Sequence, residues 1–285
     1  MTDGSGATVF ASVGDGRIAY DVVGEGPLIV LSPGLADTRA TYRFLAPRLV
    51  DAGYRVATVD LRGHGDSSAR WSSFTRADTA SDLAEVITDL GGGPAIVVGQ
   101  SFSGGAATIL AAERPDLVAA VIEIAPFTRP PSLSLAAFLR DGAYRRGTFL
   151  LGGFGITGSP RRWSQYLDMA YPTRKPSDWD SWKASVLAGL EKPDRRRAAT
   201  KMVLANAKDA AEALPHVTRP TLIIMGSQDS DFADPVAEAK GIVAALPDSI
   251  GSYVTIDGAG HYPHAEFPDE VATHILRFLT GLRLA

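Results

Sequence analysis

A serine, an aspartate and a histidine occur in this sequence where nucleophilic catalysis would need them. Ser101 comes three positions after an apolar run at residues 94–98, and Asp229 and His261 each follow a later apolar run. A serine hydroxyl is a weak nucleophile that needs a neighbouring base, and the imidazole of His261 titrates in the range suited to that task. A carboxylate such as that of Asp229 can orient the imidazole and stabilise its positive charge. These residue types predict attack by Ser101 on an electrophilic carbon.

The residues around Ser101 predict a sharp turn between a strand and a helix. An apolar strand at 94–98 precedes the serine, and the spacing of apolar residues predicts a helix at 102–113. Such a turn lifts the serine above the carboxyl edge of a parallel sheet, where open α/β sheets bind ligands. Gly99 and the small residues Ser103, Gly104 and Gly105 permit the close backbone approach that the turn requires. The free N–H groups at the start of the helix would face developing negative charge.

Short apolar runs alternate with helical patterns along most of the chain. Strands are predicted at residues 8–12, 17–23, 28–31, 54–59, 94–98, 117–124, 221–225 and 252–256. Helices are predicted at residues 42–52, 75–90, 102–113, 235–245 and 270–282. The first two strands form a hairpin, and the later alternation is typical of right-handed βαβ crossovers. The fold class is therefore α/β, with a mostly parallel central sheet flanked by helices.

Residues 130–215 interrupt this alternation. The segment is too long for a simple loop and has helical patterns of its own at 135–149, 160–169, 179–190 and 195–207. We interpret it as a helical cap inserted into a core made of residues 1–129 and 216–285. Among its aromatic residues, Phe138, Trp163 and Tyr166 are the predicted substrate contacts, although most apolar cap residues would simply hold the cap on the core. Such a roof favours compact, largely apolar substrates over long lipids.

The stretch from Gly99 through Ser101 to Ser103 resembles the nucleophile elbow, G-x-S-x-G, of the α/β-hydrolase fold superfamily. Ser103 stands where the second glycine usually lies, and it is small enough for the turn. The superfamily's usual order of nucleophile, acid and histidine is matched by Ser101, Asp229 and His261. The resemblance thus implies the fold and a catalytic triad of these three residues.

Neighbouring residues offer alternatives for two members of this triad. His264 lies close to His261, but the Gly-Ala-Gly run that the superfamily pattern expects directly precedes His261. Asp231 and Asp234 lie near Asp229, and either could instead cap the following helix. We therefore favour His261 and Asp229.

The resemblance also implies an oxyanion hole made of two backbone N–H groups. These belong to Phe102, which follows the nucleophile, and to Leu35, which lies in the loop after the third strand. The loop after the fourth strand contains Asp60 and Arg62, which we interpret as a structural polar pair.

Composition limits the classes of function. The chain has 285 residues, 45% of them hydrophobic, and a formal net charge of −4. It lacks a basic run, so neither nucleic acid nor a membrane surface is an expected partner. It contains no cysteine, which excludes disulfides, a thiolate nucleophile and cysteine-ligated metal sites. The start of the sequence lacks the pattern of a secretory signal, so a cytoplasmic location is the simplest expectation. We expect no cofactor, no metal and a small-molecule substrate, and the oligomeric state is left open.

These residues are compatible with three alternative functions. The first is an esterase or related acyl hydrolase that works through an acyl-enzyme at Ser101. The second is a lyase, a C–C bond hydrolase or a cofactor-independent oxygenase in which His261 acts on the substrate itself. The third is a receptor-like binding protein. Haloalkane dehalogenases and epoxide hydrolases of this fold carry an aspartate at the nucleophile position, so Ser101 disfavours both.

Overall fold

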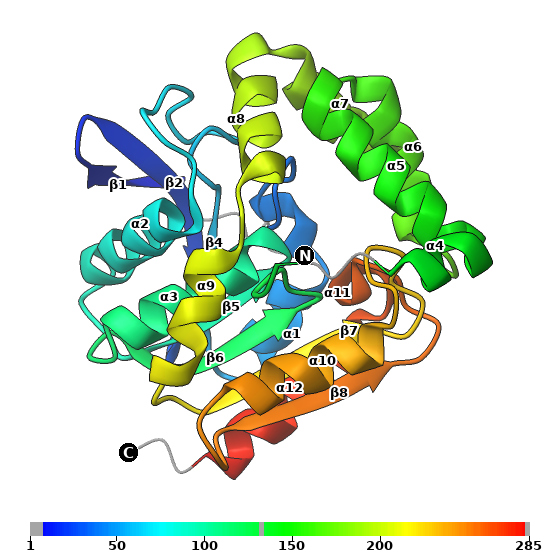
Figure 1. Cartoon of the computed structure of the whole chain (residues 1–285). Coiled ribbons are helices and arrows are strands. Elements are labelled where there is room, and N and C mark those ends of the chain that lie inside the picture. Colours follow the sequence, from blue (N-terminus) through cyan, green and yellow to red (C-terminus); the bar gives the residue numbers. More distant parts are fainter. Residues whose placement is uncertain (1–7, 131–133, 283–285) are drawn as a thin grey trace.

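The computed structural model describes residues 8–130 and 134–282, which form an eight-stranded sheet with helices on both faces (Figure 1). The strands are β1 (Val9–Val13), β2 (Gly16–Val23), β3 (Leu28–Ser32), β4 (Arg55–Val59), β5 (Ala95–Gln100), β6 (Val118–Ile124), β7 (Thr221–Gly226) and β8 (Gly251–Ile256). Their order in the sheet is β1-β2-β4-β3-β5-β6-β7-β8. The pairs β1–β2 and β2–β4 are antiparallel, and the other pairs are parallel. The predicted fold class is confirmed.

Successive residues of the central strands face opposite sides of the sheet, as the period of two requires. In β3, Ile29 and Leu31 pack toward α1 and α12, whereas Val30 packs toward α2 and α3. The helices outside the insertion are η1 (Arg39–Tyr42), α1 (Leu45–Asp51), α2 (Arg76–Asp89), α3 (Phe102–Glu113), α10 (Pro235–Ala245), α11 (Pro263–Glu266) and α12 (Pro268–Gly281). Because both faces are covered, the central strands β3, β5, β6 and β7 are mostly apolar rather than alternating.

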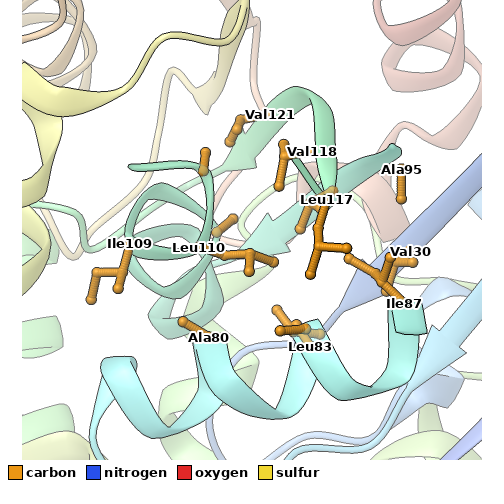
Figure 2. Packing of buried hydrophobic residues seen from close by; sticks show 14 of the residues in the cluster. Val30, Ala80, Leu83, Ile87, Ala95, Ile109, Leu110, Leu117, Val118 and Val121 are labelled. Atoms are coloured by element: carbon orange, nitrogen blue, oxygen red, sulfur yellow. The ribbon is translucent and has the colours of Figure 1, made fainter. Parts of the chain in front are cut away.

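Helix α2 shows how the sequence determines both the start and the buried face of an element. Thr75 and Asp78 form a reciprocal capping box at its first turn, a start that the sequence predicts. Ala80, Leu83 and Ile87 recur at helical spacing and belong to the apolar cluster shared with α3 and the sheet. Figure 2 shows these three side chains directed toward α3 and the strands.

The insertion between β6 and β7 is helical. Its elements are α4 (Leu135–Arg140), α5 (Gly142–Thr157), α6 (Pro160–Ala170), α7 (Trp179–Glu191), α8 (Pro193–Leu204), α9 (Lys208–Ala213) and η2 (Leu214–His216). Helices α4–α7 are grouped at the upper right of Figure 1, with α8 beside them. Residues 1–7, 131–133 and 283–285 lie outside the described residues.

The helix predicted at 135–149 is in fact two helices. Asp141 adopts an extended backbone conformation between α4 and α5, and its carboxylate accepts hydrogen bonds from the N–H groups of Ala143 and Tyr144. Apolar periodicity continues across this break, but the side-chain cap satisfies the N–H groups that a continuous helix would have bonded internally. The short helix α9 was also not predicted as a separate element.

The parallel strands carry three loops to one edge of the sheet. Ser101 follows β5, Asp229 follows β7, and His261 follows β8. Because β5, β6, β7 and β8 are consecutive parallel neighbours, their carboxyl ends meet at this edge. Within the described part of the chain, none of the helices combines the length and the apolar character needed to cross a bilayer.

Candidate active site

Ser101 lies in a strained turn between β5 and α3. Its backbone has φ 54° and ψ −116°, a conformation that non-glycine residues rarely adopt. A Cβ atom on Gly99 would overlap the backbone of Ser103, so the turn closes only with glycine there. The hydrogen bond from the N–H of Gly104 to the carbonyl of Ser101 fixes the first turn of the following helix. Strain held in this way is common where a side chain must be presented to a substrate.

The hydroxyl of Ser103 has a structural role that the sequence did not reveal. Its Oγ donates to the carbonyl oxygen of Pro33 at 2.5 Å and lies 2.9 Å from the Oγ of Ser32. The residue at the superfamily's second glycine position therefore ties the elbow to the end of β3. A serine fits at this position because its side chain turns toward that strand end.

His261 connects Ser101 to Asp229. Its Nε2 lies 2.9 Å from the Oγ of Ser101, and its Nδ1 lies 2.9 Å from Oδ2 of Asp229. All three side chains are buried. With Nδ1–H donating to the carboxylate, Nε2 is free to accept the proton of the serine hydroxyl, which is the arrangement that general-base catalysis needs.

The loop that carries His261 is fixed from two sides. The His261 N–H donates to the carbonyl of Ala170 at the end of α6, at 3.0 Å. The buried side chain of Gln100 donates through Nε2 to the His261 carbonyl at 3.1 Å. The imidazole is thus positioned by both the sheet and the helical insertion.

A second carboxylate also faces this histidine. Oδ2 of Asp231 lies 3.5 Å from Nδ1 of His261, and its side chain is only 1% exposed. The same oxygen accepts a 2.6 Å hydrogen bond from the hydroxyl of Tyr166 on α6. Asp231 is therefore not a helix cap, whereas Asp234 does cap α10 by accepting from the N–H of Ala237. The sequence offered capping as the alternative for both residues, and only the structure separates them.

The electrostatics of the cluster favour a charged imidazole. Burial by itself would lower the pKa of His261, but the charges of Asp229 and Asp231 outweigh it and raise the pKa to about 9. Burial also raises the pKa of Asp231, and Asp229 acts in the same direction, although His261 opposes both. The two carboxylates therefore make His261 a stronger base than an isolated histidine.

The loop after β3 runs past the elbow and brings Leu35 to the site. A Cβ on Gly34 would lie 3.0 Å from the Cβ of Ser101, which shows how closely the two segments approach. Leu35, Ser101 and Phe102 line one cavity. Within residues 8–130 and 134–282, the N–H groups of Leu35 and Phe102 donate to no other residue. Both are therefore available to a bound group, as the predicted oxyanion hole requires.

His64 holds this loop in place. Its Nε2 accepts a hydrogen bond from the N–H of Ala36 at 3.0 Å, and its Nδ1 lies 3.0 Å from the carbonyl oxygen of Arg62. Burial lowers the pKa of His64 to about 4, so the ring stays neutral and can accept. His264 is likewise buried and lies 3.0 Å from the Oγ1 of Thr41 rather than beside Ser101.

The cavity in front of Ser101 and His261 has a volume of about 390 Å³. Its wall is mostly apolar and comes from the core loops and from the helical insertion. The residues that the insertion contributes are Pro130, Leu151, Trp163, Tyr166, Met202, Val203, Leu204, Ala205, Asn206 and Ala207. Trp163 and Tyr166 line this cavity, and their contact with a substrate stays a prediction.

Phe138 does not line this cavity. Its ring packs edge-to-face against Phe149, with centroids 5.5 Å apart, between α4 and α5. The predicted substrate contact at Phe138 is therefore not supported, because its ring packs on Phe149 instead of lining the cavity. Spacing along a supposed continuous helix could not show this.

Asp60 and Arg62 do not pair with each other. Asp60 forms an ion pair with Arg39, and Arg62 forms a bidentate one with Asp82 at 2.7 Å. The polar pair interpreted from the sequence is thus two separate pairs, since residues two apart at a turn point in different directions.

Among the described residues, one group of acidic and histidine side chains is compact enough to hold a metal ion. It consists of Asp229, Asp231 and His261, whose ligand atoms lie within 4.8 Å of one another. Nδ1 of His261 lies 2.9 Å from Oδ2 of Asp229, and the same contact can orient the imidazole.

Residues 29–274 match the model of the alpha/beta hydrolase family. The chain belongs to this family. The α/β hydrolase is 29% identical over 275 residues to a 2-(acetamidomethylene)succinate hydrolase of Mesorhizobium japonicum, which covers 93% of the chain and 92% of the relative. It is 26% identical to the karrikin insensitive 2 receptor CA of Petunia hybrida, over 90% of the chain and 94% of the receptor.

The structure of this α/β hydrolase also resembles that of an esterase from Exiguobacterium antarcticum. The TM-score is 0.78 at 18% sequence identity, with 95% of the chain and 99% of the esterase covered. This likeness shows the shared fold. The bond that the protein cleaves has to be inferred from its own site.

Proposed function

We propose that this α/β hydrolase is a serine hydrolase that cleaves an ester or related acyl bond of a small, largely apolar substrate. The observation that carries the proposal is the imidazole of His261, whose two nitrogens lie 2.9 Å from the Ser101 hydroxyl and from the Asp229 carboxylate. An oriented base beside a strained serine is the arrangement that acyl transfer uses.

In the first half of the reaction, the Oγ of Ser101 bonds to the carbonyl carbon while its proton passes to Nε2 of His261. The N–H groups of Leu35 and Phe102 hold the resulting oxyanion. The intermediate collapses, the leaving alcohol takes the proton from Nε2, and an acyl-enzyme remains. In the second half, water loses a proton to Nε2 as it attacks the acyl carbon. Ser101 recovers that proton when the acid departs, and Asp229 stays ionised throughout.

Covalent labelling tests this proposal. An organophosphate is expected to inactivate the enzyme by modifying one residue, and mass spectrometry should locate the adduct on the peptide that contains Ser101. Ser101→Ala and His261→Ala are each expected to reduce kcat for ester hydrolysis by about 10⁴–10⁶-fold, and the double variant should lose little more because the groups act as a unit.

A different chemistry would give a different pattern. If Ser101→Ala kept most of the activity while His261→Ala abolished it, the histidine would act on the substrate itself, and the acyl-enzyme would be excluded.

A further inference from the structure

Arg76 places a buried positive charge in the wall of the cavity that contains Ser101 and His261. It is the first residue of α2, and only 4% of its surface is exposed. No other lysine or arginine of the described residues lines this cavity. The rest of the wall is mostly apolar, so this charge is the main electrostatic feature that a substrate meets away from the catalytic residues.

The guanidinium of Arg76 is held rigidly. Nε donates to the carbonyl of Phe127 at 3.1 Å, and Nη1 donates to the carbonyl of Ala205 at 3.2 Å. The group also lies over the ring of Phe102, 4.4 Å from its centroid. These contacts connect α2, the loop after β6 and the residue that follows α8, and they fix where the charge lies.

Arg76 nevertheless lacks a carboxylate partner. Arg62, the other buried arginine of the described residues, pairs with Asp78 and Asp82, and the partly buried Arg39 pairs with three aspartates. Within the described residues, no carboxylate lies within 4.0 Å of Arg76, and its Nη2 donates to no residue; Asp209 acts on it only from farther away. Burial lowers the pKa of Arg76 to about 10, so it remains protonated near neutrality.

An uncompensated charge in an apolar wall is costly. A substrate carboxylate would supply the missing countercharge and accept from Nη2, because planar guanidinium groups match planar carboxylates. Asp231, the other charged group in the wall away from the reacting atoms, is held by Tyr166 and His261 and would repel an anion. An anionic group on the substrate is therefore directed to Arg76.

We propose that Arg76 binds a carboxylate of the substrate, so that the preferred ester has an apolar body with a free acid group remote from the scissile bond. This inference rests on the proposed function, because it assigns the substrate class of the same cavity.

Matched esters test it. The substrates are p-nitrophenyl hemiesters of glutaric and adipic acid, compared with the neutral valerate and hexanoate esters of the same chain length, with spontaneous hydrolysis subtracted. The wild-type enzyme is expected to favour the hemiesters in kcat/KM. Arg76→Met should reduce this selectivity ratio by about 10–100-fold, as for loss of a hydrogen bond between charged groups. Arg76→Lys, which keeps the charge, should retain part of it.

Arg219→Met is the matched control. The guanidinium of Arg219 also donates to a backbone carbonyl, that of Pro115, but it lies outside the cavity. This variant should leave the selectivity ratio unchanged. A wild-type enzyme without preference for hemiesters, or an Arg76→Met variant that loses activity on both ester types by the same factor, overturns the proposal. If Arg76→Met does not fold, the proposal is still tested by the ratio of kcat/KM for hemiesters to that for neutral esters, measured for the wild-type enzyme and for Arg76→Lys.

A binding measurement separates this inference from the proposed function. Calorimetry should show that the Ser101→Ala variant binds monomethyl glutarate more tightly than methyl valerate. The double variant with Arg76→Met should bind the two ligands equally. If no ester is turned over but this difference is found, acyl hydrolysis fails and the carboxylate site stands. If esters are hydrolysed but the two ligands bind equally, the carboxylate site fails alone.

Discussion

The hydroxyl of Tyr166 donates a 2.6 Å hydrogen bond to Oδ2 of Asp231, which itself lies 3.5 Å from Nδ1 of His261. A residue of the helical insertion is thereby connected to the histidine of the site through one carboxylate. The ring of Tyr166 stacks on Trp163, which in turn packs at a tilt against Phe154, with 4.7 Å between the centroids of each pair, and this packing holds the hydroxyl in place. The insertion therefore contributes to the environment of His261 as well as to the cavity wall.

The pH dependence of activity should reveal the charge of Asp231. His261 must be neutral to accept the serine proton, and the two carboxylates raise its pKa to about 9, so kcat/KM should increase as the pH rises toward that value. Asp231→Asn removes one of the two charges and is expected to move this rise to lower pH. Asp234→Asn, a change at the α10 cap, should leave the profile in place. A profile that stays fixed in Asp231→Asn would exclude this role.

Replacement of the two aspartates should have unequal effects on turnover. Asp229→Asn keeps the shape but loses the charge that orients the imidazole from 2.9 Å, and a decrease of about 10⁴-fold in kcat is expected. Asp231→Asn should be much milder, because its oxygen is 3.5 Å from the same nitrogen. Steady-state kinetics at the optimal pH of each variant measures both. A larger decrease in kcat for Asp231→Asn than for Asp229→Asn would mean that Asp231 is the acid of the triad.

The hydroxyl of Ser103 should contribute to stability. Ser103→Ala removes the buried hydrogen bonds to Pro33 and Ser32 while keeping a good helix former, and we expect the free energy of unfolding to fall by about 1–3 kcal/mol. Urea denaturation measures the change. Thr273→Ala removes an exposed hydroxyl bond within α12 and should alter stability by less than about 0.5 kcal/mol. Equal effects of the two variants would show that the hydrogen bonds of Ser103 to the end of β3 do not contribute to the free energy of unfolding.

The cavity volume should limit the length of the acyl group. About 390 Å³ is near the lower end of the range for ligand pockets, so short p-nitrophenyl esters should have higher kcat/KM than those of long fatty acids. Leu151→Ala removes volume from the wall and should shift the preferred length upward. A wild-type preference for long-chain esters would mean that the cavity opens much further than the structure shows.

Local patterns in the sequence determined the fold class and most elements. The apolar runs and capping signals placed α3 and α10 at the observed bounds, and the start of α2 followed from Thr75 and Asp78. The same patterns placed Ser101, Asp229 and His261 at the ends of three strands. These features depend on residues close together in the chain, where periodicity and capping chemistry act directly.

Only the tertiary structure decided which distant side chains meet. Tyr166 and Asp231 are 65 positions apart, and Arg76 and Ala205 are 129 apart. The packing of the insertion against the core brings these pairs together, and no local pattern encodes it. Tertiary packing also explains why Phe138 does not line the cavity and why Asp60 and Arg62 have separate partners. The direction of a side chain after a turn depends on what the whole chain packs around it.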